Sequence, residues 1–324
     1  MLANAVHAIK VRLNPADFLP TATRLYEKPL ITPSSHISLG DNINGPSLIK
    51  VPGWVEKPLG RYYLYFAHHS GKHIRLAYAD SLEGPWLIHE PGTLRLGETP
   101  CLTHIASPDV HVDPLRKKIL MYFHGDVLSK QEAKNDALSQ RFPILDGQRT
   151  LLAESRDGVS FRSFPQILGP SYMRVFRFKN YFYALGMPGL FLRSEDGLKD
   201  FEPGPVLWNP RMRHSAVRVS GDYLDVFYSD AGGWPERIIV SRVDCRSEDW
   251  MRWNRISTRT ILRPEKDYEG GRLPLLPSRR GAVHYPVRQL RDPCIYEEDN
   301  QAPLLYSIAG ESGIAAAQLT TETR

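Results

Sequence analysis

The chain has 324 residues, of which 42% are hydrophobic and 24% charged, and its formal net charge is +5 at pH 7. This composition is typical of a globular protein, and no segment approaches the ~20 uninterrupted apolar residues of a membrane-spanning helix. Basic and acidic residues are interspersed rather than gathered in runs, which argues against a nucleic-acid-binding surface.

Two further features bear on where the protein works. The three cysteines, Cys101, Cys245 and Cys294, are scattered and form no CxxC pair. They therefore argue against a disulfide framework and a structural zinc site. The N-terminal segment 1–18 has a short apolar start but no long hydrophobic stretch followed by a cleavage site. We therefore expect a cytoplasmic protein, with a removed signal peptide as the alternative.

A pattern of four short apolar segments recurs along the chain. The first unit combines GPSLIKV (45–51) with RYYLYFAHHSGKHIRLAYADSLEGPW (61–86). Later units begin at SPDVHVD (107–113), MRVFRF (173–178), HSAVRV (214–219) and DPCIYEE (292–298). The segments are rich in Val, Ile, Tyr and Phe with a period of two, and Gly, Asp, Ser or Pro separates them, as in β-strands.

Five repeats of one four-strand unit predict an all-β fold, a five-bladed β-propeller formed by residues 1–324 as a single domain. A β-sandwich built of similar meanders is the alternative. We letter the strands of each four-stranded antiparallel blade A to D from the inside outwards. The fifth unit ends after strand C, so residues 24–31 are expected to supply its outer strand and close the ring.

In such a blade the start of strand A and the turn between strands B and C lie on one face. Carboxylates, imidazoles and guanidiniums from all five units occupy these positions, which predicts a functional site there. The expected substrate-binding residues are Asn44, His68, His69, His124, Arg174, Arg213, Asp230, Trp234, Arg291 and Glu311. Structural roles are the alternatives for three of them: a turn cap for Asp230, loop packing for Trp234 and a partner of Asp292 for Arg291.

Two motifs at strand-A entries, ASPDV (106–110) and RDPCI (291–295), carry a resemblance. Together with the five repeats they resemble the furanosidase-type propellers of glycoside hydrolase families 43, 32, 68 and 117. Family 43 places a general base in an Asp-Pro pair, a second Asp in an Ala-Pro-Asp-Val-like motif, and a general acid Glu in the third blade. Asp109 matches the second position, whereas Gly45 stands at the first and Arg174 near the third.

The resemblance implies an exo-acting glycoside hydrolase whose substrate is a short oligosaccharide. Cleavage needs one protonated acid and one ionised base or nucleophile. The catalytic candidates are Asp109, Asp292 and Glu236, with His214 as the alternative acid, as in the family-117 relatives. A non-catalytic carbohydrate-binding propeller, or a propeller lyase or metal-dependent hydrolase, are the competing hypotheses.

Three expectations complete the site. Residues 125–149 interrupt the second unit at its B–C turn and are expected to form a lid. No cofactor or catalytic metal is expected, while Ca²⁺ or another ion on the propeller axis is left open. Arg174, Arg213 and Arg291 at the mouth predict an anionic or strongly polar group on a small carbohydrate substrate. The oligomeric state is not predicted.

Overall fold

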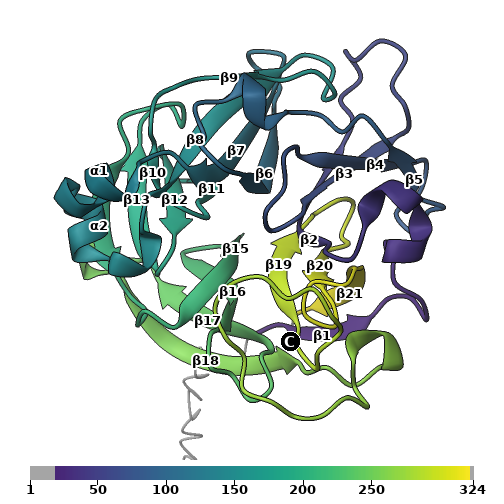
Figure 1. Ribbon diagram of the computed structural model, residues 1–324. Helices are drawn as coiled ribbons and strands as arrows, with labels where there is room; N and C mark the ends of the chain where they lie inside the picture. The colour runs from purple at the N-terminus through teal and green to yellow at the C-terminus, as the bar shows by residue number, and fades with distance from the viewer. Residues whose placement is uncertain (1–18, 322–324) are drawn as a thin grey trace, which may run out of the picture.

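The computed structural model describes residues 19–321 and confirms the predicted fold. Five antiparallel sheets surround a central axis, with the innermost strand of each sheet facing the middle of the ring (Figure 1). None of the described helices has the length and apolar character required to span a membrane. The segment 1–18, on which the expected cytoplasmic location depends, lies outside the described residues.

The blades follow one another along the chain, and within each blade the strands are hydrogen-bonded from the inner to the outer one. They consist of β2 (Asn44–Lys50), β3 (Tyr62–Ala67), β4 (Arg75–Ala79) and β5 (Leu87–His89); β6 (Ile105–Asp113), β7 (Lys118–Asp126), β8 (Gln148–Ser155) and β10 (Gly169–Pro170), with β9 (Arg162–Ser163) also on β8; β11 (Arg174–Phe178), β12 (Tyr181–Gly186), β13 (Leu190–Ser194) and β14 (Glu202–Val206); β15 (Met212–Ser220), β16 (Tyr223–Asp230), β17 (Ile238–Asp244) and β18 (Asn254–Leu262); and β19 (Arg291–Ile295), β20 (Pro303–Ser307), β21 (Ile314–Thr320) and β1 (Thr21–Arg24). Short helices lie in the connections: η2 (Pro33–Ser35), η3 (Ile37–Leu39), η4 (Leu96–Glu98), α1 (Lys130–Asn135), α2 (Ala137–Arg141), η5 (Pro143–Leu145), η6 (Trp250–Arg252) and η7 (Asp267–Glu269).

The hydrophobic core consists of five clusters, and each cluster fills the interface between two neighbouring blades. Strand β3 shows how the sequence produces this arrangement, because all six of its residues are buried. Tyr63 and Tyr65 pack against the second blade, whereas Leu64 and Phe66 pack against the fifth. Alternate side chains thus serve opposite neighbours, which explains the unbroken apolar sequence of this strand.

The ring closes as a four-stranded fifth blade whose outer strand comes from the N-terminal side. This strand is β1, which pairs with β21 over Thr21–Arg24, three residues earlier than the expected range 24–31. The expected range contains Pro29, which cannot donate to a ladder. Pairing therefore stops after the Leu25 amide, and contact with β21 resumes only at Leu30 and Ile31.

A residue in the left-handed backbone region lies close to the start of each inner strand. These residues are Gly45 (φ 61°), Ser107 (50°), Tyr172 (64°), His214 (51°) and Asp292 (48°). In four of the five blades the ladder register shifts at this point, as in a β-bulge. Positive φ costs a residue other than glycine about 1–3 kcal/mol and is concentrated at functional sites. In four of the five blades the residue at this position is not glycine, so the cost applies there.

Residues 125–149, the expected lid, connect β7 to β8 and contain α1 and α2. Ser129 caps α1, and its hydroxyl accepts the Glu132 amide at 3.3 Å while the Glu132 carboxylate accepts the Ser129 amide at 2.8 Å. Arg149 is buried beneath the helices and donates to Ser139 Oγ and to the Asp136 carboxylate. The segment is therefore a folded cover anchored by a buried guanidinium.

Candidate active site

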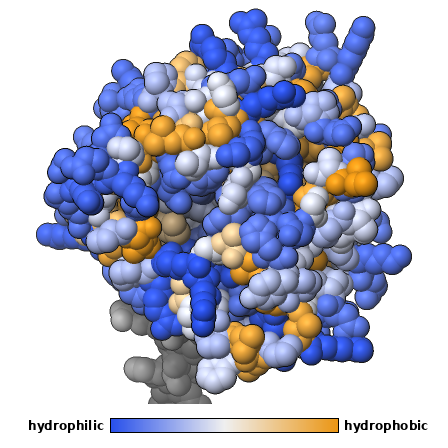
Figure 2. Space-filling model, viewed as in Figure 1, coloured by the Kyte–Doolittle hydropathy of each residue, from blue (hydrophilic) through white to orange (hydrophobic). Residues whose placement is uncertain are grey.

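A pocket of about 140 Å³ lies at the centre of the face where the inner strands begin; we call it the axial pocket. Figure 2 shows mainly hydrophilic residues on the pictured face, with apolar residues in separate small patches. Seven predicted site residues line the axial pocket: Asn44, His69, His124, Arg213, His214, Asp292 and Glu311. The segment 125–149, the expected lid, contributes Ile144 and Gln148 to its wall.

Asp292 is the most unusual of these residues. Its Oδ1 accepts a short hydrogen bond from the Tyr172 hydroxyl and lies 3.2 Å from His214 Nδ1. Its Oδ2 is buried without a well-formed hydrogen bond, which is rare for a native polar atom. Burial, followed by the negative charge of Glu311, raises the pKa of Asp292 above its usual value, although Tyr172 opposes the change. Asp292 is thus biased towards its protonated form.

Glu311 has the opposite environment, although it lines the same pocket. Its Oε1 accepts Arg291 Nη1 at 2.8 Å and lies 3.4 Å from His69 Nδ1, and its Oε2 accepts Asn42 Nδ2 at 2.6 Å. Burial alone would raise the pKa of Glu311, but interactions with His69, Arg291 and Asn42 outweigh it and lower the pKa to about 2. Glu311 is therefore a carboxylate at any physiological pH.

A chain of alternating buried charges supports the pocket. Glu236 Oε1 accepts Arg213 Nε at 2.9 Å and its Oε2 accepts Arg213 Nη2 at 2.6 Å, and Arg291 Nε lies 3.2 Å from the same Oε2. Glu236, a predicted catalytic residue, is fully buried and does not line the axial pocket. Arg213 and Arg291 are occupied by Glu236 and Glu311, which leaves neither free to fork onto an anionic substrate group.

Two of the pocket histidines are neutral. Burial, followed by the charges of Arg213 and Arg291, holds the pKa of His214 well below its usual range. Burial and neighbouring His104 do the same for His124, whose Nδ1 has no hydrogen-bond partner among the described residues. A neutral His214 holds no proton to give as a general acid, so its geometry suits hydrogen bonding to Asp292 instead.

Asp109 and Asp292 do not reach one sugar ring, contrary to expectation. Asp109 borders a second, larger cavity of about 660 Å³ lined by the following part of the inner strands. Its Oδ2 lies 2.8 Å from His111 Nε2 and accepts the Val175 amide at 2.8 Å, so it links two blades. Arg174 also borders this lower cavity and donates to the backbone carbonyls of blades 2 and 4. Neither residue lines the axial pocket.

Four other predicted residues also lie outside the axial pocket, and one of them is Arg291, which is fully buried and pairs with Glu236 and Glu311. Asp230 lies 3.6 Å from Arg237 and 3.8 Å from Arg211. Trp234 is 64% exposed and donates to the Leu275 carbonyl, away from the pocket. His68 does not line the pocket and lies beside other side chains with metal-binding atoms that are described below.

The sequence reasoning assigned no role to three pocket residues. Tyr172 lies on the expected face, and its position before a blade's inner strand was the available signal. His104 directly precedes β6, the inner strand of the second blade. Arg280 comes from the long connection before β19, outside the repeat, and forms no ion pair with a described residue; it donates to the Pro210 carbonyl. Nothing in the repeat pattern could have found it.

Comparison with known proteins yields one sequence relative and a consistent set of folds. The chain is 35% identical over 312 residues to "Uncharacterized protein R118" of Acanthamoeba polyphaga mimivirus, covering 86% of this chain and 83% of the relative. No family model matches the chain.

Solved structures of glycoside hydrolases share the architecture at 12–14% identity. A family-43 β-xylosidase/α-arabinofuranosidase from a compost microbial metagenome, in complex with xylotriose, has a TM-score of 0.59 and 12% identity, covering 93% of this chain and 96% of that chain. The catalytic domain of the Coprinopsis cinerea family-62 α-L-arabinofuranosidase has a TM-score of 0.57 and 14% identity, with coverage of 95% and 98%. An α-L-arabinofuranosidase from Lactobacillus brevis has a TM-score of 0.54 and 12% identity, with coverage of 95% and 94%. At these identities the likeness is one of fold.

Proposed function

This chain belongs to the family of the mimivirus protein and has the propeller fold of family-43 and family-62 glycoside hydrolases, and from its axial pocket we propose that it is a glycoside hydrolase that removes one terminal sugar from a short oligosaccharide. One observation carries the proposal. Two carboxyl groups line one small pocket, and their surroundings push their pKa values in opposite directions. Such a pair separates the acid from the base in carboxylate-based catalysis.

Asp292 is the proposed general acid, and Glu311 is the proposed base or nucleophile. The proton of Asp292 passes to the glycosidic oxygen as the bond to the anomeric carbon breaks. The ionised Glu311 either attacks that carbon or takes a proton from the water that does so. Water finally supplies a hydroxyl to the sugar and a proton to Asp292, so that the enzyme returns to its starting state.

The pocket also offers groups that could hold a sugar. Asp292 Oδ2 and His124 Nδ1 are buried atoms without good partners, and sugar hydroxyls can satisfy both. The pocket volume of about 140 Å³ is below the ~300–1,000 Å³ of pockets for drug-sized ligands. The lid further restricts the space through Ile144 and Gln148. One ring in the pocket and the remaining sugars outside it is the arrangement of an exo-acting enzyme.

The proposed carboxylates differ from those that the family-43 resemblance implies. Both come from the fifth blade, with Asp292 at the start of β19 and Glu311 in the turn between β20 and β21. Gly45 and Arg174 stand where that family has its Asp and Glu. The proposal therefore depends on the geometry of this pocket and not on the family's catalytic set.

The test is a screen of aryl glycosides and short oligosaccharides, followed by two variants on the best substrate. Asp292→Asn and Glu311→Gln keep the side-chain shape and remove the acid or the charge, so each should lower kcat by about 10²–10⁴. Asp230→Asn is the matched control, since Asp230 lies outside the pocket, and should remain within a few-fold of the unaltered protein. Trisaccharides should lose one sugar from one end.

Three outcomes would contradict the proposal. Near-normal kcat in both variants would remove the assigned acid and base. Release of internal fragments would remove the exo mode. Saturable binding of sugars by the unaltered protein without turnover of any of them would favour the non-catalytic carbohydrate-binding alternative.

A further inference from the structure

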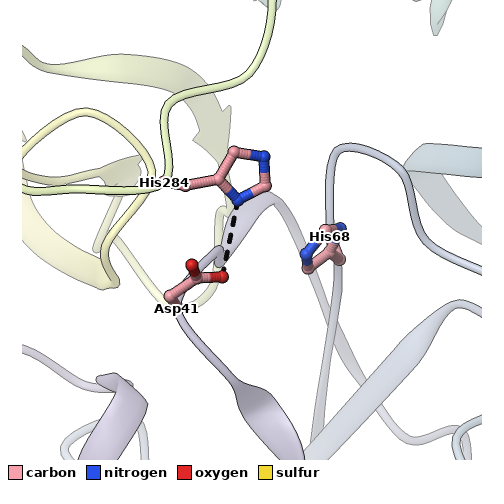
Figure 3. A group of neighbouring side chains, drawn as sticks. All are labelled: Asp41, His68 and His284. Carbon is pink, nitrogen blue, oxygen red and sulfur yellow. Dashed lines mark hydrogen bonds and ion pairs between the residues drawn. The ribbon is translucent and has the colours of Figure 1, made fainter.

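Three side chains with metal-binding atoms meet close to the segments that contact Glu311. Asp41 precedes β2, His68 follows β3, and His284 lies in the long connection before β19. One ligand atom from each lies within 4.8 Å of those of the other two. Figure 3 shows the Asp41 carboxylate joined to the His284 ring, at 3.5 Å, with the His68 ring on the neighbouring turn. We propose that these residues bind a divalent transition-metal ion, with Zn²⁺ as the best fit, and that the ion stabilises the surroundings of Glu311.

The ligand chemistry selects this class of ion. Two imidazoles and one carboxylate suit Zn²⁺ and similar metals, whereas Ca²⁺ and Mg²⁺ prefer oxygen ligands throughout. Three protein ligands leave a position of a tetrahedral ion open to water or to a sugar hydroxyl.

Two features limit the expected affinity. Nδ1 of His68 accepts the Ser70 amide at 3.0 Å, and a ring that ligates a metal must reorganise this bond or its tautomer. Buried Arg75 adds positive charge nearby, which disfavours an ion held by charge alone. Direct metal–imidazole bonds are therefore required, and we expect weaker binding than at a fully preformed site.

The position of the site suggests its effect. Each proposed ligand is adjacent in sequence to a group that contacts Glu311: Asp41 to Asn42, His68 to His69, and His284 to Val283. Asn42 donates to Glu311 Oε2 at 2.6 Å, and the Val283 amide donates to the same atom at 3.4 Å. His69 Nδ1 lies 3.4 Å from Oε1. An ion that joins the three segments would fix all three contacts at once.

The metal site itself does not depend on the proposed function, whereas any effect on turnover does. For this reason the test reads binding and local protection rather than activity. Calorimetric titration of the EDTA-treated and dialysed full chain should give saturable binding of one Zn²⁺ and none of Ca²⁺. His284→Ala should weaken Zn²⁺ binding at least tenfold. His89→Ala, a change of another histidine on outer strand β5, is the matched control and should bind as the unaltered chain does.

Hydrogen exchange then tests the link to Glu311. With Zn²⁺ present, the amides of residues 40–44, 68–72 and 281–286 should exchange more slowly in the unaltered chain and not in His284→Ala. The side chains of His284 and Asp41 are both partly exposed, so neither His284→Ala nor the second variant, Asp41→Asn, should disturb folding. Absence of saturable Zn²⁺ binding, or equal binding by His284→Ala, would overturn the site. Binding without added protection would overturn its effect on Glu311.

Discussion

The buried charge chain beneath the axial pocket gives a stability prediction that can be worked out in advance. Glu236→Gln removes the negative charge between Arg213 and Arg291, and the new amide also presents a donor to one guanidinium. Glu236 has no exposed surface, and it accepts Ser229 Oγ at 2.7 Å in addition to Arg213. Removing one partner of such a buried pair costs about 3–5 kcal/mol.

This cost translates into a measurable melting temperature. With an unfolding entropy of about 2.1 cal/mol/K per residue, a chain of 324 residues changes Tm by about 1.5 °C for each kcal/mol. Glu236→Gln should therefore lower Tm by about 4–7 °C in a calorimetric scan at pH 7. The matched control is Glu202→Gln, the same chemical change in a surface pair in which Arg193 lies at 3.3 Å.

The control should lose about 1.5 °C or less, because surface ion pairs contribute about 0–1 kcal/mol. If Glu236→Gln melted within a degree of Glu202→Gln, the two arginines would not depend on Glu236, and the buried chain would not support the pocket as described. The pKa of Glu236 gives an independent check. Burial alone would raise this pKa, but Arg213 and Arg291 lower it on balance. The Glu236 carboxylate should therefore stabilise the folded state at any pH above the ordinary carboxyl pKa, and this stabilisation should be lost as the pH falls through the lowered pKa.

A chain that begins at residue 25 lacks β1 and the hydrogen bonds from Arg24 to Glu269 (2.7 and 2.8 Å). It should melt at a lower temperature and aggregate through the open edge of β21. A soluble monomer with an unchanged Tm would remove the ring-closure argument. The pH profile of kcat/KM should fall as the pH rises through the raised pKa of Asp292, because the acid form is lost, and should fall on the acidic side only towards the pKa of Glu311 at about 2. A rate that increased from neutral to alkaline pH would show that Asp292 does not act as the acid. The same raised pKa means that Asp292 adds stability below the ordinary carboxyl pKa and loses it as the pH rises through the folded value.

The fold could be predicted because its signal is repeated and local. Alternating apolar residues and turn residues recur five times, and a strand such as β3 shows its two buried faces in its own sequence. The outer strand of the last blade was placed slightly too late, because a single apolar run does not show where hydrogen bonding stops. Only the position of Pro29 hinted at the break.

The site was harder to predict because each inner strand has two layers of residues. Residues at the left-handed position, such as His214 and Asp292, face the axial pocket. Residues two positions later, such as Asp109 and Arg174, line the lower cavity. A sequence motif places both layers at a strand entry, and only the backbone bulge separates them. Long-range partners were also invisible, as the pairing of Glu236 with Arg213 and Arg291 shows.

Arg174 has a consequence for how material moves through the site. Its guanidinium lies 4.6 Å from the centre of the Tyr172 ring, which lines the axial pocket, while the residue itself borders the lower cavity. Its bonds to the carbonyls of Ser107, Pro108 and Ser215 hold it between the two spaces. Arg174 therefore lies between the axial pocket and the lower cavity. Under the proposed function, substrate and product would both pass through the mouth of the axial pocket, so a product sugar would have to leave before the next substrate could bind.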